Sequence, residues 1–226
     1  MAETPHYHGH RRRLRRRFLK DSGAGFSDYE LIELILFGAL PRTDVKPLAK
    51  ALLKRFGTFA ELIAAPAADI RKVPGAGEAV VVALKSVQAA AVRLMQDELM
   101  DRPVLTNWRR LLDYCHASMA RERTEQFRVL YLDRKNVLMA DEVQQSGTVD
   151  HAPVYPREVM KRALELGASA LIVVHNHPSG DPTPSAADVE MTEALAAAAN
   201  KLGLVLHDHV IVGRTGHASF KSLGLL

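Results

Sequence analysis

The sequence predicts an α/β protein with an all-helical N-terminal domain and a second domain in which helices and strands alternate. Residues 1–100 contain helical patterns broken by loops, whereas strand-like apolar runs alternate with helical segments in residues 104–226. The chain has 226 residues, of which 47% are hydrophobic, which suffices for one or two domains with a buried core. Proline interrupts the helical pattern at Asp101-Arg102-Pro103, so we place the domains at 1–100 and 104–226.

Helix caps and apolar spacing define the helices of the first domain. Ser27 and Glu30 form a predicted capping box before apolar residues that recur with helical spacing. A second helix is expected to open at Asp44 and to end at Gly57, and a third begins in FAELIAA, residues 59–65. These segments predict a helical bundle.

The segment DIRKVPGAGEAVVVALKSVQAAAVRLM contains two predicted helices joined by the turn 73–77. Gly75 and Gly77 in this turn let the backbone approach another surface closely, and the N–H groups that open the second helix form a phosphate site. The combination looks like a helix-hairpin-helix, which binds the nucleic-acid backbone without reading bases. The alternative is a helix–helix turn that serves packing only.

Positive charge is concentrated in the first domain. Residues 1–100 carry 16 Lys and Arg against 11 Asp and Glu, whereas residues 101–226 carry 14 against 15. A basic region of this kind favours a polyanion, and the partner we expect is DNA, contacted through its backbone and without sequence preference.

Much of this charge lies in RRRLRRRFLK, residues 11–20. Leu14 and Phe18 are four residues apart and can face a core while the arginines point into solvent or onto a polyanion. Arg11, Arg12 and Arg13 are therefore candidate nucleic-acid contacts. The alternative is a solvated, partly disordered arm.

The second domain is predicted to begin with a capped helix in TNWRRLLDYCHASMA and to continue with a β-hairpin. The hairpin strands are EQFRVLYLD and VLMADEVQQSGT, separated by the polar turn RKN. Pro156 starts a helix that ends at Gly167, and the apolar run SALIVVHNH after it is typical of a buried strand. A helix from about Ser185 to Leu202 closes at Gly203, and LVLHDHVIVG is the next strand.

The stretch HNHPSGDPTPSAAD predicts a metal site. His175 and His177 are two residues apart on a strand and so point to the same face. The turn after them can bring the chain back and deliver Asp188 from the first turn of the next helix. Two nitrogens and one carboxylate suit zinc, and three protein ligands leave a fourth position open for water. Ser185 and Asp188 also fit a capping box, and the two interpretations are compatible.

A second pair, His207-Asp-His209, has the same alternation, but no acid follows it at a helix start. We expect His209 to be structural, or hydrogen-bonded near the metal site, and His207 to lie on the surface.

The spacing from His175 to Asp188 resembles the H-x-H-x(7)-S-x(2)-D motif of the JAMM, or MPN-type, zinc metalloproteases. The wording HNHPSGDPTPSAAD, together with PREV, DHVIVG, PRTDVKPLAK and VPGAG, is more narrowly similar to the bacterial RadC family. The resemblance implies a zinc domain with a sheet between helices, an N-terminal helix-hairpin-helix region, and His175, His177 and Asp188 as ligands of one zinc ion per chain. It also implies that the Ser185 hydroxyl hydrogen-bonds a developing oxyanion.

The same resemblance implies an upstream glutamate as general base. Glu125, at the start of EQFRVLYLD, is the first choice, because the related metalloproteases place theirs there. Glu142 and Glu158 are the alternatives.

These residues predict a zinc-dependent hydrolase of peptide or isopeptide bonds joined to a DNA-binding module, and the RadC resemblance implies a connection with DNA repair or recombination. One rival is a nuclease, which commonly uses two metals and here needs Asp181 to recruit a second ion. The other is a DNA-binding adaptor without catalysis. The absence of a P-C-x-x-C segment argues against a zinc deaminase more strongly than against a nuclease.

A single cysteine, Cys115, permits no internal disulfide and no redox pair, so a reducing compartment is expected, and the cytoplasm is the simplest. The sequence has no apolar run of about 18 residues for a membrane span. Its N-terminus also lacks the apolar core of a secretory signal. We therefore expect neither a membrane partner nor export.

Overall fold

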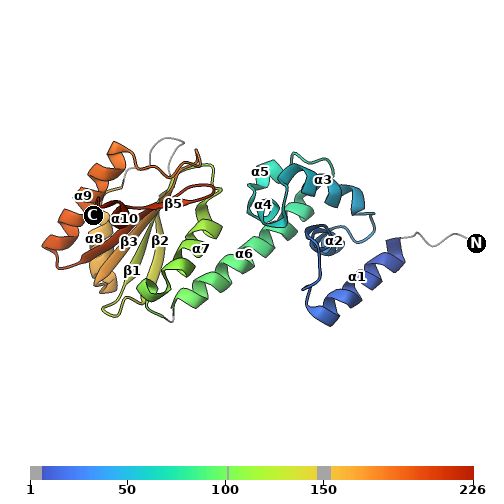
Figure 1. Ribbon diagram of the computed structural model, residues 1–226, viewed down its shortest axis with the longest axis horizontal. Coiled ribbons are helices and arrows are strands. Elements are labelled where there is room, and N and C mark those ends of the chain that lie inside the picture. The colour runs from blue at the N-terminus through green and yellow to red at the C-terminus, as the bar shows by residue number, and fades with distance from the viewer. Residues whose placement is uncertain (1–6, 101, 147–153) are drawn as a thin grey trace, which may run out of the picture. The chain divides into compact units, whose positions relative to one another are not determined.

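The computed structural model describes residues 7–100, 102–146 and 154–226 (Figure 1). The chain forms two compact units, Met1–Ala91 and Val92–Leu226. The division falls inside helix α6, Glu78–Met100, because Leu99 near its end is buried in the core of the second unit.

The first unit is helical, as the sequence predicted. Ser27 caps α2 and its hydroxyl accepts from the backbone N–H of Glu30, whose carboxylate accepts in turn from the N–H of Ser27, so the capping box is confirmed. The helix predicted to open at Asp44 begins at Lys46, and the Asp44 carboxylate accepts from the Lys46 N–H. Besides the start of α6, the helices are α1 (Tyr7–Asp21), α2 (Asp28–Ala39), α3 (Lys46–Phe56), α4 (Phe59–Ala64) and α5 (Ala67–Ile70).

Helix α1 packs on the first unit's core through Leu14, which is 4% exposed. The neighbouring Arg11 is also buried, and its guanidinium donates to the carbonyl of Leu40 at 2.8 Å and to that of Pro41 at 2.9 Å. It donates further to the carbonyls of Phe37 and Thr43.

These acceptors lie at the C-terminal end of α2 and in the turn after it, where backbone carbonyls lack helical partners. A planar guanidinium supplies several donors to such a group at once. The assignment of Arg11 as a nucleic-acid contact is therefore corrected, since its donors are used inside the fold. Arg12 and Arg13 are exposed, and α1 is an ordered helix rather than a loose arm.

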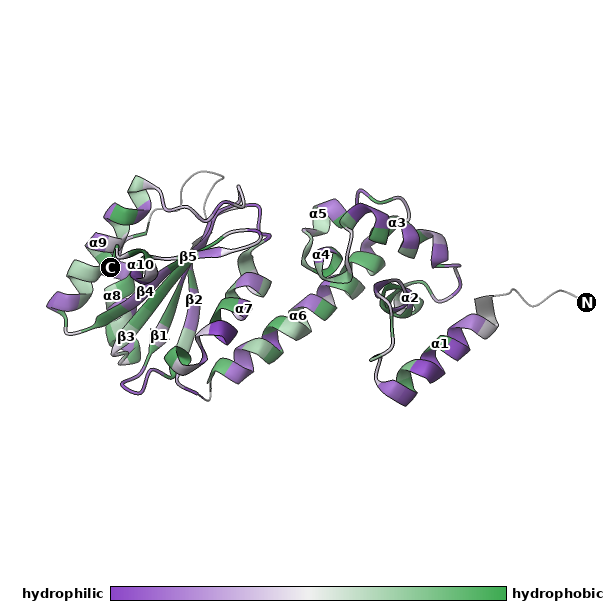
Figure 2. Ribbon diagram, viewed as in Figure 1, coloured by the Kyte–Doolittle hydropathy of each residue, from purple (hydrophilic) through white to green (hydrophobic). Residues whose placement is uncertain are grey.

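The second unit has a five-stranded mixed sheet in the order β2-β1-β3-β4-β5. The pair β3 and β4 is parallel, and the other neighbours are antiparallel. Figure 2 shows apolar residues concentrated in the central strands. The strands are β1 (Gln126–Leu132), β2 (Leu138–Ser146), β3 (Ala170–Asn176), β4 (Val205–Val212) and β5 (His217–Ser219).

Helices cover both faces of this sheet, which confirms the α/β class and the predicted mixed sheet flanked by helices. Helix α7 packs on one face, where Leu111 and Cys115 meet Ile172 and Val174. Helices α8 and α9 pack on the other face against alternate residues of the same strands. The helical elements are η1 (Val104–Asn107), α7 (Trp108–Met119), α8 (Pro156–Leu166), α9 (Ala186–Lys201) and α10 (Phe220–Leu223).

Most predicted boundaries of the second unit hold. Helix α8 begins at Pro156 and ends at Gly167, which has a left-handed conformation. The hairpin is present, although its last two predicted residues, 147 and 148, lie outside the described residues. The first helix differs, because a 3₁₀ turn precedes Trp108 and Asn107 makes no side-chain cap bond. In the described ranges, every helix is too short or too polar to cross a membrane.

Replacing Arg11 with Gln should lower the free energy of unfolding of the first unit by roughly 2–3 kcal/mol, because several backbone carbonyls lose a charged donor. Arg12→Gln is the matched control, since this neighbour is exposed and should change stability by no more than about 0.5 kcal/mol. Urea denaturation of the full chain measures both. Equal stability of the two variants would contradict the structural role of Arg11.

Candidate metal centre

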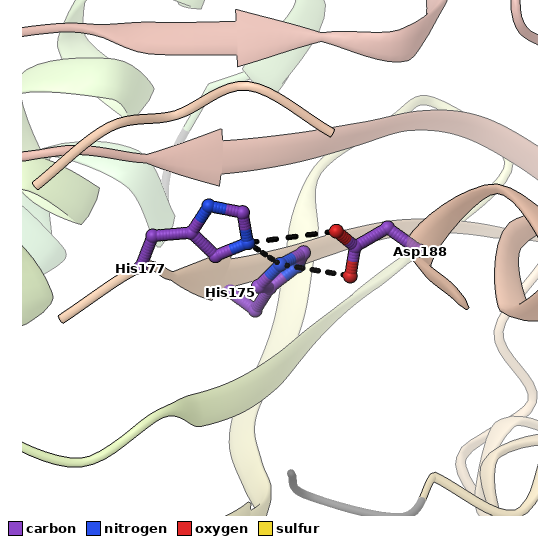
Figure 3. A group of neighbouring side chains, drawn as sticks. All are labelled: His175, His177 and Asp188. Carbon is purple, nitrogen blue, oxygen red and sulfur yellow. Dashed lines mark hydrogen bonds and ion pairs between the residues drawn. The ribbon is translucent and has the colours of Figure 1, made fainter. Parts of the chain in front are cut away.

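The structure brings together the three predicted metal ligands, His175, His177 and Asp188 (Figure 3). His175 is fully buried because it lies in β3, the middle strand of the sheet. His177 comes just after the strand, and Asp188 lies in the first turn of α9. Among the residues that the structure describes, this is the group of three or more His, Cys, Asp or Glu side chains able to hold a metal ion.

The distances between the donor atoms fit tetrahedral coordination. The Nε2 atoms of His175 and His177 are 3.0 Å apart. His175 Nε2 lies 3.2 Å from Asp188 Oδ1, and His177 Nε2 lies 3.5 Å from Asp188 Oδ2. Zinc bonds of about 2.0–2.1 Å to nitrogen and oxygen separate tetrahedral ligands by roughly 3.3 Å. The donor set therefore fits zinc in both chemistry and spacing.

The start of α9 fixes the carboxylate of Asp188. Its Oδ2 accepts from the backbone N–H of Ser185 at 2.8 Å and from the Ser185 hydroxyl at 2.7 Å. Ser185 in turn caps the helix by accepting from the Asp188 N–H at 3.2 Å. The predicted capping box is thus confirmed, and the same carboxylate faces the histidines.

A backbone carbonyl sets the tautomer of His177. Its Nδ1 lies 2.7 Å from the carbonyl oxygen of Asp181, an atom that only accepts hydrogen bonds. His177 Nδ1 therefore carries a proton, and in the neutral ring the lone pair is on Nε2, toward Asp188.

A longer chain of hydrogen bonds sets the tautomer of His175. The Thr192 hydroxyl donates its one proton to the backbone carbonyl of Asp188 at 2.5 Å, so its oxygen accepts from His209 Nδ1 at 2.6 Å. His209 Nε2 then accepts from His175 Nδ1 at 2.7 Å. Burial first, and then the neighbouring His175, lower the pKa of His209 well below its usual value, so this ring is neutral.

Two imidazole lone pairs and a carboxylate thus converge, and a cation is needed among them. Burial works to raise the pKa of Asp188, but His175 and His177, which donate to the ionised carboxylate when their Nε2 atoms are protonated, outweigh burial and hold that pKa well below the usual range. The bond to Asp188 raises the pKa of His177, against the effect of burial. The site therefore favours positive charge beside the ionised carboxylate, and a divalent metal ion would supply that charge.

The three candidate bases differ in their surroundings. Glu125 lies between α7 and β1, close enough for its charge to contribute to the raised pKa of His177. Glu142 accepts from the Arg162 guanidinium in three hydrogen bonds at 2.7 to 3.1 Å. Glu158 is exposed and accepts from Arg157. Only the surroundings of Glu125 connect it with the metal ligands.

The predicted turn of the helix-hairpin-helix lies in the first unit, between α5 and α6. Gly75 has φ +88°, a conformation that favours glycine, whereas Gly77 does not. A side chain at Gly77 meets no atom within 4 Å. The helix before the turn, α5, is present and has four residues, Ala67–Ile70.

Thr192 and the backbone carbonyl of Asp181 support the ligands, and the sequence analysis missed both of these roles. Thr192 lies four residues after Asp188, on the same helix face, and this spacing was a signal available in the sequence. Asp181 acts through its backbone carbonyl, which no residue pattern reveals. His209 was expected near the site and lies there, whereas His207 is half-buried and its Nε2 lies 2.6 Å from Asn136 Oδ1.

Comparison with known proteins identifies the family. A family model described as the RadC-like JAB domain matches residues 105–225. The chain belongs to the RadC-like family. The chain is also 62% identical over 213 residues to the UPF0758 protein of Rhodobacter capsulatus, an alignment that covers 94% of this chain and 100% of that protein.

The RadC-like match confirms the resemblance read from HNHPSGDPTPSAAD. It begins in the 3₁₀ turn before α7 and ends one residue before the C-terminus, so it includes the whole sheet and all three metal ligands. The relative from R. capsulatus extends the similarity into the helical first unit.

Removing the Thr192 hydroxyl should weaken zinc binding about 10- to 100-fold, the usual effect of losing a group that orients a metal-ligating histidine. Thr192→Val has nearly the same shape but leaves His209 Nδ1 without its acceptor. Thr192→Ser keeps the hydroxyl and should restore most of the affinity. Competition with a chelator of known zinc affinity measures the effect, and equal affinities of the Val and Ser variants would refute the chain of hydrogen bonds.

Proposed function

We propose that this RadC-like chain is a zinc-dependent hydrolase of amide bonds, acting as a peptidase or an isopeptidase. The observation that carries the proposal is the convergence of two imidazole lone pairs and one carboxylate, each with its orientation fixed by hydrogen bonds. Three protein ligands leave one tetrahedral position for water or substrate. The side chains of His177 and Asp188 are 18% and 11% exposed, so the site is partly accessible to solvent.

Zinc in this position would act as a Lewis acid and lower the pKa of a coordinated water to about 7. His175, His177 and Asp188 would hold it. The remaining chemistry falls to side chains at the rim of the site.

Glu125 fits the role of general base. Its charge is close enough to His177 to contribute to the raised pKa of that ring, whereas the observed interactions of Glu142 and Glu158 are with arginines. In the proposed reaction the Glu125 carboxylate accepts a proton from the attacking water and returns it to the nitrogen of the leaving amine.

Ser185 fits the role of hydrogen-bond donor to the oxyanion. Ser185 is exposed, and its hydroxyl donates to Asp188 Oδ2. Rotation of this hydroxyl hydrogen would aim it at the carbonyl oxygen of a bound substrate as negative charge develops there. A preorganised donor of this kind contributes about 3–4 kcal/mol in other hydrolases.

The described residues give less support to a two-metal nuclease. Asp181, the candidate for a second ion, accepts from the backbone N–H and the hydroxyl of Thr183 through Oδ1. Its carbonyl oxygen is already the acceptor for His177. Within the described ranges, a single metal-ligand set is present, and it does not include Asp181.

Replacing Glu125 with Gln should leave the zinc content at about one ion per chain and lower hydrolysis roughly 10²–10⁴-fold, because the amide cannot accept the proton of water. Asp188→Ala should lose the zinc itself. The probe is a proteome-derived peptide library supplemented with lysine-branched peptides, and mass spectrometry counts the new termini. Elemental analysis gives the zinc content.

Glu142→Gln is the control, since it removes the same charge from a residue bound to Arg162. Full activity of Glu125→Gln would rule out Glu125 as the base. If the zinc-loaded wild type cleaves neither probe, the hydrolase proposal fails and the adaptor without catalysis becomes the better account.

We further propose that the first unit binds DNA through the exposed face of α1. Arg12, Arg16 and Lys20 follow one another at four-residue intervals and are all exposed, so they form one line along the helix. The opposite face packs on the core through Leu14. A rigid row of cations suits the phosphate backbone and carries no information on base sequence. Gly77 and the start of α6 are a second candidate contact.

Arg12→Gln/Arg16→Gln should weaken binding to duplex DNA and should flatten the plot of log affinity against log salt by about one to two units, because fewer counterions are released. Lys50→Gln/Lys54→Gln is the matched control, as it removes two exposed cations with the same spacing from α3. Fluorescence anisotropy over a salt series measures both. Equal slopes for the two double variants would exclude α1 as the contact.

A further inference from the structure

Asn176, between the two metal-ligating histidines, has a buried carboxamide that contacts a different part of the chain. Successive side chains of a strand point to opposite faces, so Asn176 projects away from the ligands, toward the α7 side of the sheet. Asn176 is fully buried.

All three hydrogen bonds of this carboxamide go to the backbone around Glu125. The N–H of Gln126 donates to Asn176 Oδ1 at 2.8 Å. Asn176 Nδ2 donates to the carbonyl of Thr124 at 3.2 Å and to that of Glu122 at 3.5 Å. Because a backbone N–H only donates and a backbone carbonyl only accepts, these partners fix which end of the carboxamide is oxygen.

These hydrogen bonds connect the two segments just beyond the last backbone pair of β1 and β3. The ladder between β1 and β3 has its last pair at Phe127 and His175. In the same register the next pair would be Gln126 and Asn176, and there the side chain of Asn176 takes the place of a backbone acceptor. Residues 120–125, all described, form neither helix nor strand. Glu125 is therefore held between two anchored neighbours.

We propose that Asn176 is a positioning residue, which fixes the backbone on both sides of Glu125 to the end of β3, next to the two metal-ligating histidines. Three consecutive residues then set the geometry of the reaction, since His175 and His177 hold the metal from one face of β3 while Asn176 holds the base segment from the other. The inference rests on the proposed role of Glu125 as general base. Loss of the Asn176 hydrogen bonds would displace Glu125 without displacing His175, His177 or Asp188.

The test compares Asn176→Ala with Val174→Ala in the zinc-loaded full chain. Val174 is buried on the same strand and the same face, two residues earlier, and packs in the core beneath α7. Val174→Ala thus removes buried side-chain volume, as Asn176→Ala does, but leaves the hydrogen bonds to residues 122–126 in place. Neither variant alters a ligand, so both should bind one zinc ion with the affinity of the wild type.

Hydrogen exchange followed by mass spectrometry gives the readout that needs no substrate. In Asn176→Ala the amides of residues 122–126 should exchange roughly tenfold faster than in the wild type, because the bonds that close this segment are lost. In Val174→Ala their exchange should not change relative to the rest of the unit. Unchanged exchange in Asn176→Ala, or loss of its zinc, would overturn the proposal.

Turnover of the peptide probes is the second readout. A misplaced base should lower kcat of Asn176→Ala about 10²-fold, with little change in KM. Faster exchange together with wild-type kcat would overturn the positioning role. Full activity of Glu125→Gln is a different result, because it removes the base assignment itself, whereas the exchange measurement does not depend on that assignment.

If Asn176→Ala does not fold, the wild-type protein still decides the matter by NMR. The two side-chain amide protons of Asn176 should resist exchange with solvent, whereas those of the exposed Asn200 should exchange freely. Equally fast exchange at both asparagines would overturn the proposal.

Discussion

The hydrogen bond from the Thr192 hydroxyl to the backbone carbonyl of Asp188 determines which nitrogens of His209 and His175 carry protons. A hydroxyl has one proton, so this bond leaves the Thr192 oxygen as an acceptor for His209. His209 then accepts from His175, which leaves the His175 Nε2 lone pair free for a metal. The bond that starts this chain is itself made to a ligand residue, so α9 both supplies the carboxylate and orients the imidazole.

The sheet makes this arrangement possible because β3 is its middle strand. His175 is shielded by β1 and β4 on its two sides, and on its own face Phe127 stacks 6.2 Å away between ring centroids. Burial keeps water from competing for the protons of the chain, and it makes an unpaired polar atom costly. The end of the same strand is where the chain leaves the sheet, and His177 is accordingly partly exposed. The metal site is therefore buried at His175 and partly exposed at His177.

Much of the site was predictable because its ligands lie close together in the sequence. Strand alternation placed His175 and His177 on one face, and the capping pattern placed Asp188 at a helix start. Contacts between segments far apart in the sequence were harder to predict. The backbone carbonyls that bind Arg11 carry no residue signature, so its positive charge alone led to a wrong expectation. The carboxamide of Asn176 likewise acts on residues fifty positions away in the chain.

The most direct test of the account is X-ray absorption spectroscopy at the zinc edge on the full chain loaded with one equivalent of zinc. The account predicts four nitrogen or oxygen neighbours at about 2.0–2.2 Å, with the outer-shell scattering of two imidazole rings. Three imidazoles would mean that His209 is a ligand and that the chain of hydrogen bonds is misread. A sulfur neighbour at about 2.3 Å, or no stoichiometric zinc, would contradict the assignment of His175, His177 and Asp188.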